Sequence, residues 1–281
     1  MALAVRALTP SFGAEVVGID VNNVQPHVID ELPRLWQRYG LLLFRGQVMD
    51  ERQQAAFSRH FGALEIHLRR EYLSPENPEI LYVSNIKRDG RSIGILSDTE
   101  VGWHYDQIYL PRPAVGSMLY SVIIPRDGGQ TSFADMTAAY EMLPARLKDK
   151  IAGRMAVQSY EAFNRVYSVP TSAEQKKKTP DIEHPIVRTH PYTGRKALYL
   201  CPGMTTQIVG LPKAESDATL AEIFEWCVRP AFVYTHAWRL GDALLWDNAC
   251  TMHRREPFDS NEQRLMKRTT ILPDAERAVP T

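Results

Sequence analysis

The stretch GWHYDQIY (102–109) is the most informative part of the sequence, because it places two metal-ligand residue types on one strand-like segment. Alternate side chains of a strand point the same way, so His104 and Asp106 are expected to project together. Farther along, LLWDNACTMHRREPF (244–258) predicts a strand that runs into a loop carrying His253. Two histidines and one carboxylate on one face leave three coordination positions open, which is the facial triad of non-haem iron oxygenases.

The segments around these two stretches predict a strand-rich chain. Short, turn-bounded runs of apolar, β-branched or aromatic residues indicate strands at 13–19, 40–46, 80–86, 116–124, 196–202, 243–249 and 267–273. Helical spacing or capping signals indicate helices at 27–39, 50–61, 137–152 (interrupted at Pro144) and 213–228. Many short strands with few helices predict a mainly β fold, a double-sheet jelly roll with helical additions, and we expect one domain over 1–281.

Composition excludes several classes of protein. The 281 residues carry 33 basic and 33 acidic side chains, so no broad field for nucleic acid or an acidic membrane is expected. The three scattered cysteines indicate buried free thiols. Neither a signal peptide nor an apolar run of about 20 residues is evident. We therefore expect a soluble, cytoplasmic protein without a nucleic-acid or membrane partner, and a homo-oligomer.

Arg264 follows the second ligand segment and points to the cosubstrate. The dianion 2-oxoglutarate can chelate iron through its C1 carboxylate and C2 keto oxygen, and its C5 carboxylate then needs a cation. The planar fork of an arginine matches a carboxylate better than lysine does. Taken alone, Arg264 and Arg268 are more simply explained as strand-surface charges, and the same three ligands could hold zinc in a hydrolase.

The order of several motifs resembles the TauD/TfdA family, which includes taurine dioxygenase and 2,4-dichlorophenoxyacetate dioxygenase. The resemblance runs from about residue 8 to about residue 273. The herbicide-degrading branch is the more similar one, through FRGQ, FADM followed by AAY, and VGLP. The motifs are WHYD (103–106), GGQTSFADM (128–136), HPIVRTHPYTGRKALYL (184–200), GDALLWDNACTMHR (241–254) and R-x-x-x-R (264–268).

The resemblance implies a double-stranded β-helix, a cupin-like jelly roll, with iron(II) held by His104, Asp106 and His253. It places Thr131 and Arg264 on the C5 carboxylate of 2-oxoglutarate. It places Arg268 near the C1 carboxylate and the anionic end of the primary substrate.

The same resemblance matches His67 to a histidine that contacts the substrate anion. Met204 stands where the taurine enzyme has an aromatic residue, and a methionine makes a more adaptable pocket wall. Both Met204 and the Leu68–Arg70 stretch depart from the taurine enzyme and argue against taurine as the substrate.

The implied reaction consumes 2-oxoglutarate and O₂, releases succinate and CO₂, and hydroxylates a C–H bond of a small organic acid. Desaturation or cleavage of an ether or C–S bond would use the same site. Two different classes of protein, a zinc hydrolase and a non-catalytic binding protein, also stay open. Segment 160–182 is a candidate lid that keeps water out, and its polar part, 169–185, is expected to be a loop. Tyr160, Phe163 and Tyr167 are candidate pocket walls.

Three further histidines receive structural interpretations. His184 and His190 belong to a proline-flanked block and are expected to be structural. His236 is expected on a strand, with a backbone hydrogen-bond partner.

Overall fold

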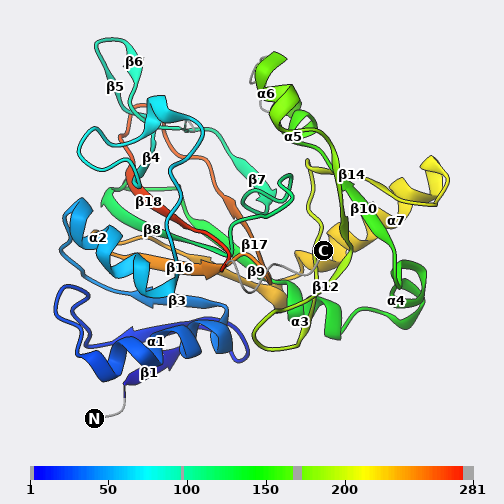
Figure 1. The fold of residues 1–281 in the computed structure, drawn as a ribbon, viewed down its shortest axis with the longest axis horizontal. Coiled ribbons are helices and arrows are strands. Elements are labelled where there is room, and N and C mark those ends of the chain that lie inside the picture. Colours follow the sequence, from blue (N-terminus) through cyan, green and yellow to red (C-terminus); the bar gives the residue numbers. More distant parts are fainter. Residues whose placement is uncertain (1–2, 96–97, 167–172, 275–281) are drawn as a thin grey trace.

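The computed structural model describes residues 3–95, 98–166 and 173–274, and its largest element is a seven-stranded sheet (Figure 1). The strand order is β1-β2-β3-β16-β8-β18-β4, in which β2 and β3 pair in parallel and the other neighbours are antiparallel. The strands are β1 (Ala4–Ala7), β2 (Ala14–Val17), β3 (Leu41–Phe44), β4 (Leu81–Ser84), β8 (Gly116–Ile123), β16 (Ala243–Asp247) and β18 (Leu265–Ile271).

A four-stranded antiparallel sheet packs against the large one and carries the predicted histidine ligands. Its order is β15-β9-β17-β7. Phe133 of this sheet packs on Trp246 of the large sheet, with 5.6 Å between ring centroids, in a core cluster shared by both sheets. The strands are β7 (Val101–His104), β9 (Thr131–Asp135), β15 (Val233–His236) and β17 (Thr251–Arg255). Two facing sheets, antiparallel except for the β2–β3 pair, confirm the expected jelly-roll core with helical additions.

Helices α1 (Pro26–Tyr39) and α2 (Glu51–Ser58) cover the outer face of the large sheet. Strand β3 is buried along its whole length, since Leu42 packs toward these helices and Leu43 packs into the core between the sheets. Gly40 ends α1 with φ 67°, a left-handed conformation that glycine adopts without steric cost, as the sequence predicted.

Most of the remaining elements form an extension between β9 and β15, on the right in Figure 1. Pro144 precedes α4 and separates it from α3, as predicted. The helices are α3 (Met136–Glu141), α4 (Ala145–Ile151), α5 (Tyr160–Val166), α6 (Ala173–Lys178) and α7 (Lys213–Cys227). The small sheets are β11 (Ile182–Pro185), β10 (Met155–Gln158) and β14 (Thr205–Ile208), then β12 (Val187–Thr189) with β13 (Lys196–Leu198). A separate hairpin joins β5 (Lys87–Arg88) to β6 (Arg91–Ser92), and three short 3-10 helices are η1 (Arg59–Phe61), η2 (Arg70–Tyr72) and η3 (Pro230–Phe232).

The candidate lid differs from its prediction. Within 169–185 the described residues form helix α6 and strand β11, so the expectation of a loop is wrong there. The run Glu174–Lys178 forms an i,i+4 ion pair, which supports a short helix despite the polar composition. Tyr167 lies outside the described residues.

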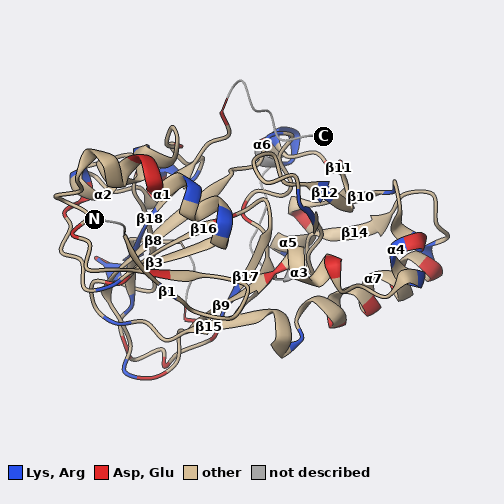
Figure 2. Cartoon of the chain, turned by 90° about the horizontal axis from the view of Figure 1, so that it is seen from below, with Lys and Arg blue, Asp and Glu red and all other residues tan. Residues whose placement is uncertain are grey.

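The surface agrees with the balanced composition. Basic and acidic residues are interspersed along the elements in Figure 2, and the three cysteines are buried free thiols. Among the helices that the structure describes, none has both the length and the apolar character needed to cross a membrane.

Candidate functional site

The structure brings His104, Asp106 and His253 together. His104 ends β7 and lies directly opposite His253 in the antiparallel pair with β17, and the two ring centroids are 4.1 Å apart. Asp106 follows in the turn after β7, and one ligand atom from each of the three residues lies within 4.8 Å of the others. His253 lies inside a strand, so the expectation that a loop presents it is wrong. Strand register, set by backbone hydrogen bonds, therefore fixes the two histidines.

The electrostatics leave this cluster ready to bind a cation. All three side chains are buried, and burial lowers the pKa of His104 and holds the pKa of His253 well below its usual range. Burial opposes ionisation of Asp106, but Arg268 and the two histidines hold the pKa of its carboxyl well below the usual range. At neutral pH the cluster thus presents two neutral imidazoles and one carboxylate, the protonation state that a metal requires.

Hydrogen bonds orient two of these ligands. His104 donates from Nδ1 to the Gly102 carbonyl oxygen at 2.8 Å, which leaves the lone pair on Nε2. The Ser117 hydroxyl donates to Asp106 Oδ2 at 2.7 Å. His253 Nδ1 is buried and has no hydrogen-bond partner in the described part of the chain. An unsatisfied buried nitrogen beside a carboxylate and a second imidazole fits a metal ion.

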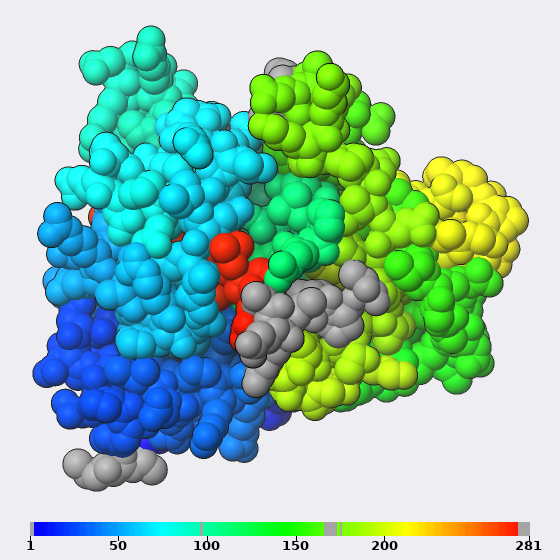
Figure 3. Space-filling model, in the orientation of Figure 1, coloured from blue at the N-terminus to red at the C-terminus, as the bar shows by residue number. Residues whose placement is uncertain are grey.

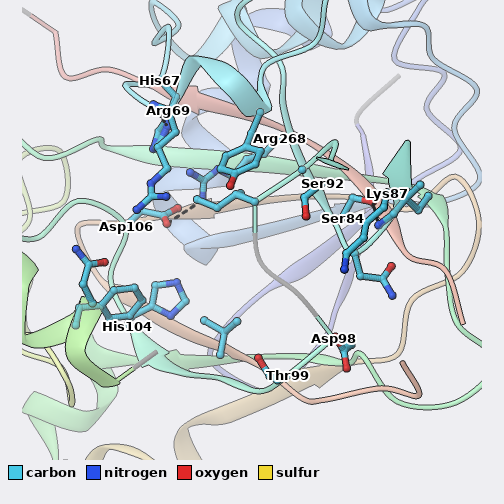
Figure 4. Close-up of a pocket in the computed structure, with 18 of the residues that line it drawn as sticks. His67, Arg69, Ser84, Lys87, Ser92, Asp98, Thr99, His104, Asp106 and Arg268 are labelled. Atoms are coloured by element: carbon cyan, nitrogen blue, oxygen red, sulfur yellow. Dashed lines mark hydrogen bonds and ion pairs between the residues drawn. The ribbon is translucent and has the colours of Figure 1, made fainter. Parts of the chain in front are cut away.

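Arg268 lies on β18 and pairs with Asp106, with 3.1 Å between Arg268 Nη1 and Asp106 Oδ1 (Figure 4). From the sequence, a second inward-facing arginine beside Arg264 would be a costly buried charge unless an external anion met it. The structure corrects that premise, because a carboxylate of the chain itself already meets the guanidinium.

Arg264 lies just before β18 and has no counter-ion among the described residues. Its side chain is 2% exposed, its Nε has no acceptor, and no carboxylate of the described residues lies within ion-pair distance. Burial and the positive charge of Arg255 lower its pKa to about 9. An uncompensated buried guanidinium is costly, so this position requires an anionic ligand.

The two arginines line different cavities. Their even spacing in the sequence predicts that both side chains enter one cavity. Arg264 lines a small cavity of about 90 Å³ with Gly129 and Trp238, whereas Arg268 lines the large pocket beside His104, so that expectation is corrected. Met266, between them, packs into the core between the sheets.

Thr131 begins β9, two residues after Gly129, which lies beside the Arg264 side chain. Its hydroxyl oxygen accepts a hydrogen bond from Trp238 Nε1 at 3.0 Å. An indole can only donate, so the Thr131 hydroxyl keeps its own proton for another acceptor. Trp238 also lines the small cavity with Arg264, so one side chain connects the Thr131 hydroxyl to the wall that carries the cation.

A cavity of about 790 Å³ opens beside the metal-ligand cluster. It is lined by the predicted substrate residues His67 and Met204, together with Tyr160 and Phe163 of α5. The Phe163 ring lies 5.9 Å from that of His104, so the candidate lid contacts the site. In Figure 3 the red C-terminal residues are visible between the cyan and green segments on this face. Burial and the positive charge of Arg268 lower the pKa of His67 to about 4, so its imidazole is neutral at neutral pH.

Sequence reasoning missed Ser117, Trp238 and Arg69, which also lines the large cavity. Ser117 was visible as a lone hydroxyl inside the apolar strand GSMLYSVII, a weak signal without its partner. The structural histidines were predicted more closely. His184 and His190 form hydrogen bonds to other residues of the protein, which fits their predicted structural role. His236 contacts the Asp242 carboxylate at 3.0 Å instead of the expected backbone group.

Comparisons with known proteins agree with this geometry. The family described as "Taurine catabolism dioxygenase TauD, TfdA family" matches residues 4–270. An alpha-ketoglutarate-dependent 2,4-dichlorophenoxyacetate dioxygenase of Cupriavidus pinatubonensis is 35% identical, covering 98% of this chain and 99% of its own. An (S)-phenoxypropionate/alpha-ketoglutarate-dioxygenase of Sphingobium herbicidovorans is 32% identical, with 97% and 96% covered.

Solved structures of dioxygenases are also similar to this chain. The crystal structure of AAD-2 in complex with Mn(II) and N-oxalylglycine superposes with a TM-score of 0.85 at 30% identity, with both chains fully covered. A taurine dioxygenase from Burkholderia xenovorans superposes with a TM-score of 0.81 at 29% identity, covering 98% of this chain and 90% of that one. N-oxalylglycine has the two carboxylates of 2-oxoglutarate and stands in for it. This chain therefore belongs to the TauD/TfdA family and is a metal- and 2-oxoglutarate-dependent dioxygenase.

Proposed function

We propose that this chain uses iron(II), 2-oxoglutarate and O₂ to hydroxylate a C–H bond of a small organic acid. One oxygen atom enters the product and the other enters succinate, with CO₂ released from C1 of 2-oxoglutarate. The observation that carries the proposal is the buried guanidinium of Arg264, which has no counter-ion among the described residues, in a chain that also assembles a buried His-His-Asp cluster. A zinc hydrolase would have the same cluster but no use for that cation.

In this proposal His104, Asp106 and His253 hold the iron. Their protonation states and the unsatisfied Nδ1 of His253 support the assignment. Bound there, iron(II) would activate O₂ for the oxidation. Ser117 holds one oxygen of Asp106 and thereby fixes the direction of the other.

For the cosubstrate, Arg264 and Thr131 bind the C5 carboxylate. Arg264 supplies charge and a planar pair of donors, and Thr131 donates its free hydroxyl proton. Arg268 lies on the metal side of β18 and is assigned to the C1 carboxylate and the anionic end of the substrate. Its guanidinium has donors beyond the Nη1 that contacts Asp106.

The primary substrate is assigned to the large cavity, in contact with His67 and Met204. Its aromatic walls suit an aryl or alkyl tail better than a compact zwitterion such as taurine. The names of the relatives, which act on dichlorophenoxyacetate and phenoxypropionate, support an aryloxyalkanoate-like acid. The single domain over 1–281 is proposed with support from the nearly full-length family match, while the cytoplasmic location and the homo-oligomer stay predictions.

The test is substrate-dependent succinate formation from 2-oxoglutarate, with iron(II) and O₂, over a panel of aryloxyalkanoates, sulfonates and amino-acid-like acids. We expect an aryloxyalkanoate to stimulate succinate formation. Mass spectrometry should then detect the hydroxylated product or its breakdown product. Hydrolysis of an ester or amide with zinc, without consumption of 2-oxoglutarate, would contradict the proposal. A dehydrogenated product would instead identify a desaturase.

A further inference from the structure

The segment that carries His67 presents a second charged side chain to the large cavity. Ile66 and Leu68 are 51% and 63% exposed, whereas the alternating residues His67 and Arg69 are half-buried and line the cavity. This alternation is that of an extended chain with one face toward the pocket. Figure 4 shows Arg69 extending from beside His67 toward the part of the pocket where Asp106 lies.

Arg69 differs from the other cations of the site in its partners. Arg268 is paired with Asp106, and Arg264 lines the separate small cavity. Lys87 also lines the large cavity, but it is an exposed residue of the β5–β6 hairpin. No carboxylate of the described residues lies within ion-pair distance of Arg69, and its guanidinium makes a 3.3 Å hydrogen bond from Nη2 to Tyr160 Oη. A guanidinium has five N–H donors, so most of those of Arg69 remain available to a ligand.

Tyr160 completes a receptor for a carboxylate. Its hydroxyl accepts from Arg69 and therefore keeps its own proton to donate. Tyr160 belongs to α5 and packs on Tyr109, with ring centroids 4.4 Å apart, so the polar pair borders an aromatic wall. A cation, a hydroxyl donor and flat apolar rings match an acid with an aryl tail.

We propose that Arg69, assisted by Tyr160, binds the carboxylate of the primary substrate in the large cavity. This inference rests on the proposed function and refines it, because it moves the main charge contact of the substrate from Arg268 to Arg69. Arg268 then serves mainly Asp106 and the cosubstrate. Arg69 thereby selects anionic substrates over their neutral analogues.

The experiment compares Arg69→Gln with the matched control Arg70→Gln, which removes the same charge from the exposed neighbouring residue. The probes are (2,4-dichlorophenoxy)acetate, (S)-2-phenoxypropionate and their amides. Steady-state turnover gives KM and kcat, and calorimetry on the protein loaded with Mn(II) and N-oxalylglycine gives the substrate Kd. The affinity for 2-oxoglutarate is measured in parallel.

We expect Arg69→Gln to weaken binding of the acids about 10- to 100-fold, below the full loss for a desolvated pair because the side chain is half-buried. Binding of the amides and of 2-oxoglutarate should stay unchanged, kcat should fall less than KM rises, and Tyr160→Phe should have a smaller effect of the same sign. Arg70→Gln should resemble the unaltered protein.

Equal affinity of the acids for Arg69→Gln and the unaltered protein would overturn this inference alone and return the anion to Arg268. Loss of 2-oxoglutarate affinity in Arg69→Gln would overturn it as well, since Arg69 would then serve the cosubstrate. If the unaltered protein binds none of the acids while still consuming 2-oxoglutarate, the proposed substrate class falls and this inference falls with it.

Discussion

Two buried clusters of this chain each contain a histidine and an aspartate, but they differ in their third residue and in how their atoms are satisfied. In each, one ligand atom per residue lies within 4.8 Å of the others. The first, the metal-ligand cluster, lies between β7 and β17, and the second, the clamp cluster, lies at the end of β16. Their members are His104, Asp106 and His253 for the first, and His190, Asp247 and Cys250 for the second.

In the clamp cluster, the ligand atoms of His190 and Asp247 are hydrogen-bonded within the protein. His190 Nε2 donates to Asp247 Oδ2 at 2.8 Å, while its Nδ1 accepts from the backbone N–H groups of Tyr192 and Thr193 at 3.2 Å. The other oxygen of Asp247 accepts from the Ala249 N–H at 2.7 Å. With both imidazole nitrogens engaged, no lone pair of His190 is left for a metal.

The metal-ligand cluster has the opposite property, because His253 Nδ1 has no partner among the described residues, while His104 and Asp106 line a large cavity. A histidine beside an aspartate occurs in both clusters, so that pair alone does not distinguish a metal site from a structural clamp. An unsatisfied buried nitrogen in a cluster whose other members line a cavity does, because folding alone would not favour leaving it so.

The sharpest test of this contrast replaces His253 with phenylalanine, which keeps a ring against Trp246 and removes the nitrogens. Loss of an outer hydrogen-bond partner already costs metal affinity about 10–100-fold, so loss of a ligand should cost more than about 100-fold. Succinate formation should disappear, while the metal-free protein unfolds at the same or a higher denaturant concentration. Retained metal affinity, measured by calorimetry, would refute the ligand assignment.

Arg264→Met should lower the affinity for 2-oxoglutarate by about 2–5 kcal/mol, which is tens- to thousands-fold. The ligand-free protein should be no less stable, because the change removes a buried charge without a counter-ion. Titration with 2-oxoglutarate measures the affinity, and chemical denaturation measures the stability of the ligand-free protein. Unchanged affinity would move the C5 site elsewhere, and a large loss of stability would reveal an internal partner for Arg264.

His190→Phe is the matched change in the clamp cluster and should behave in the reverse way. It leaves Asp247 Oδ2 and two backbone N–H groups without their partner, so the free energy of unfolding should fall by about 1–3 kcal/mol. Metal affinity should stay as it was. If metal affinity fell while stability held, the roles assigned to the two clusters would be exchanged.

Thr131→Val should have the smallest effect. It removes one neutral hydroxyl donor from the proposed C5 site, which is worth about 0.5–1.5 kcal/mol of 2-oxoglutarate affinity. The Trp238 indole also loses its acceptor, so a small loss of stability should accompany the change. An effect as large as that of Arg264→Met would assign the anion mainly to Thr131.

The sequence predicted local structure well where a signal is local. The strand at 40–46 and the helix at 213–228 follow from runs and spacing of apolar residues, and Gly40 ends its helix as expected. The short helix α6 was not predicted, because lysine-rich polar composition lacks an apolar face to indicate it. Its ion pairs become visible only once the backbone is helical.

Candidate ligands were predictable from residue types and family resemblance, but their partners were not. The pairing of Arg268 with Asp106 joins residues far apart in the chain, as do the contacts of Ser117 and Trp238. Such contacts depend on how two sheets face each other, and spacing along the chain carries no information about that.

The direct pairing of His104 with His253 has a consequence for how this chain tolerates change in length. A one-residue insertion inside β7 or β17 would turn one imidazole to the opposite face of the sheet. By contrast, residues 136–232 form an insertion between β9 and its neighbour β15 in the four-stranded sheet. Relatives could have a longer, shorter or different insertion, and with it a different wall of the substrate pocket, while both imidazoles kept their positions.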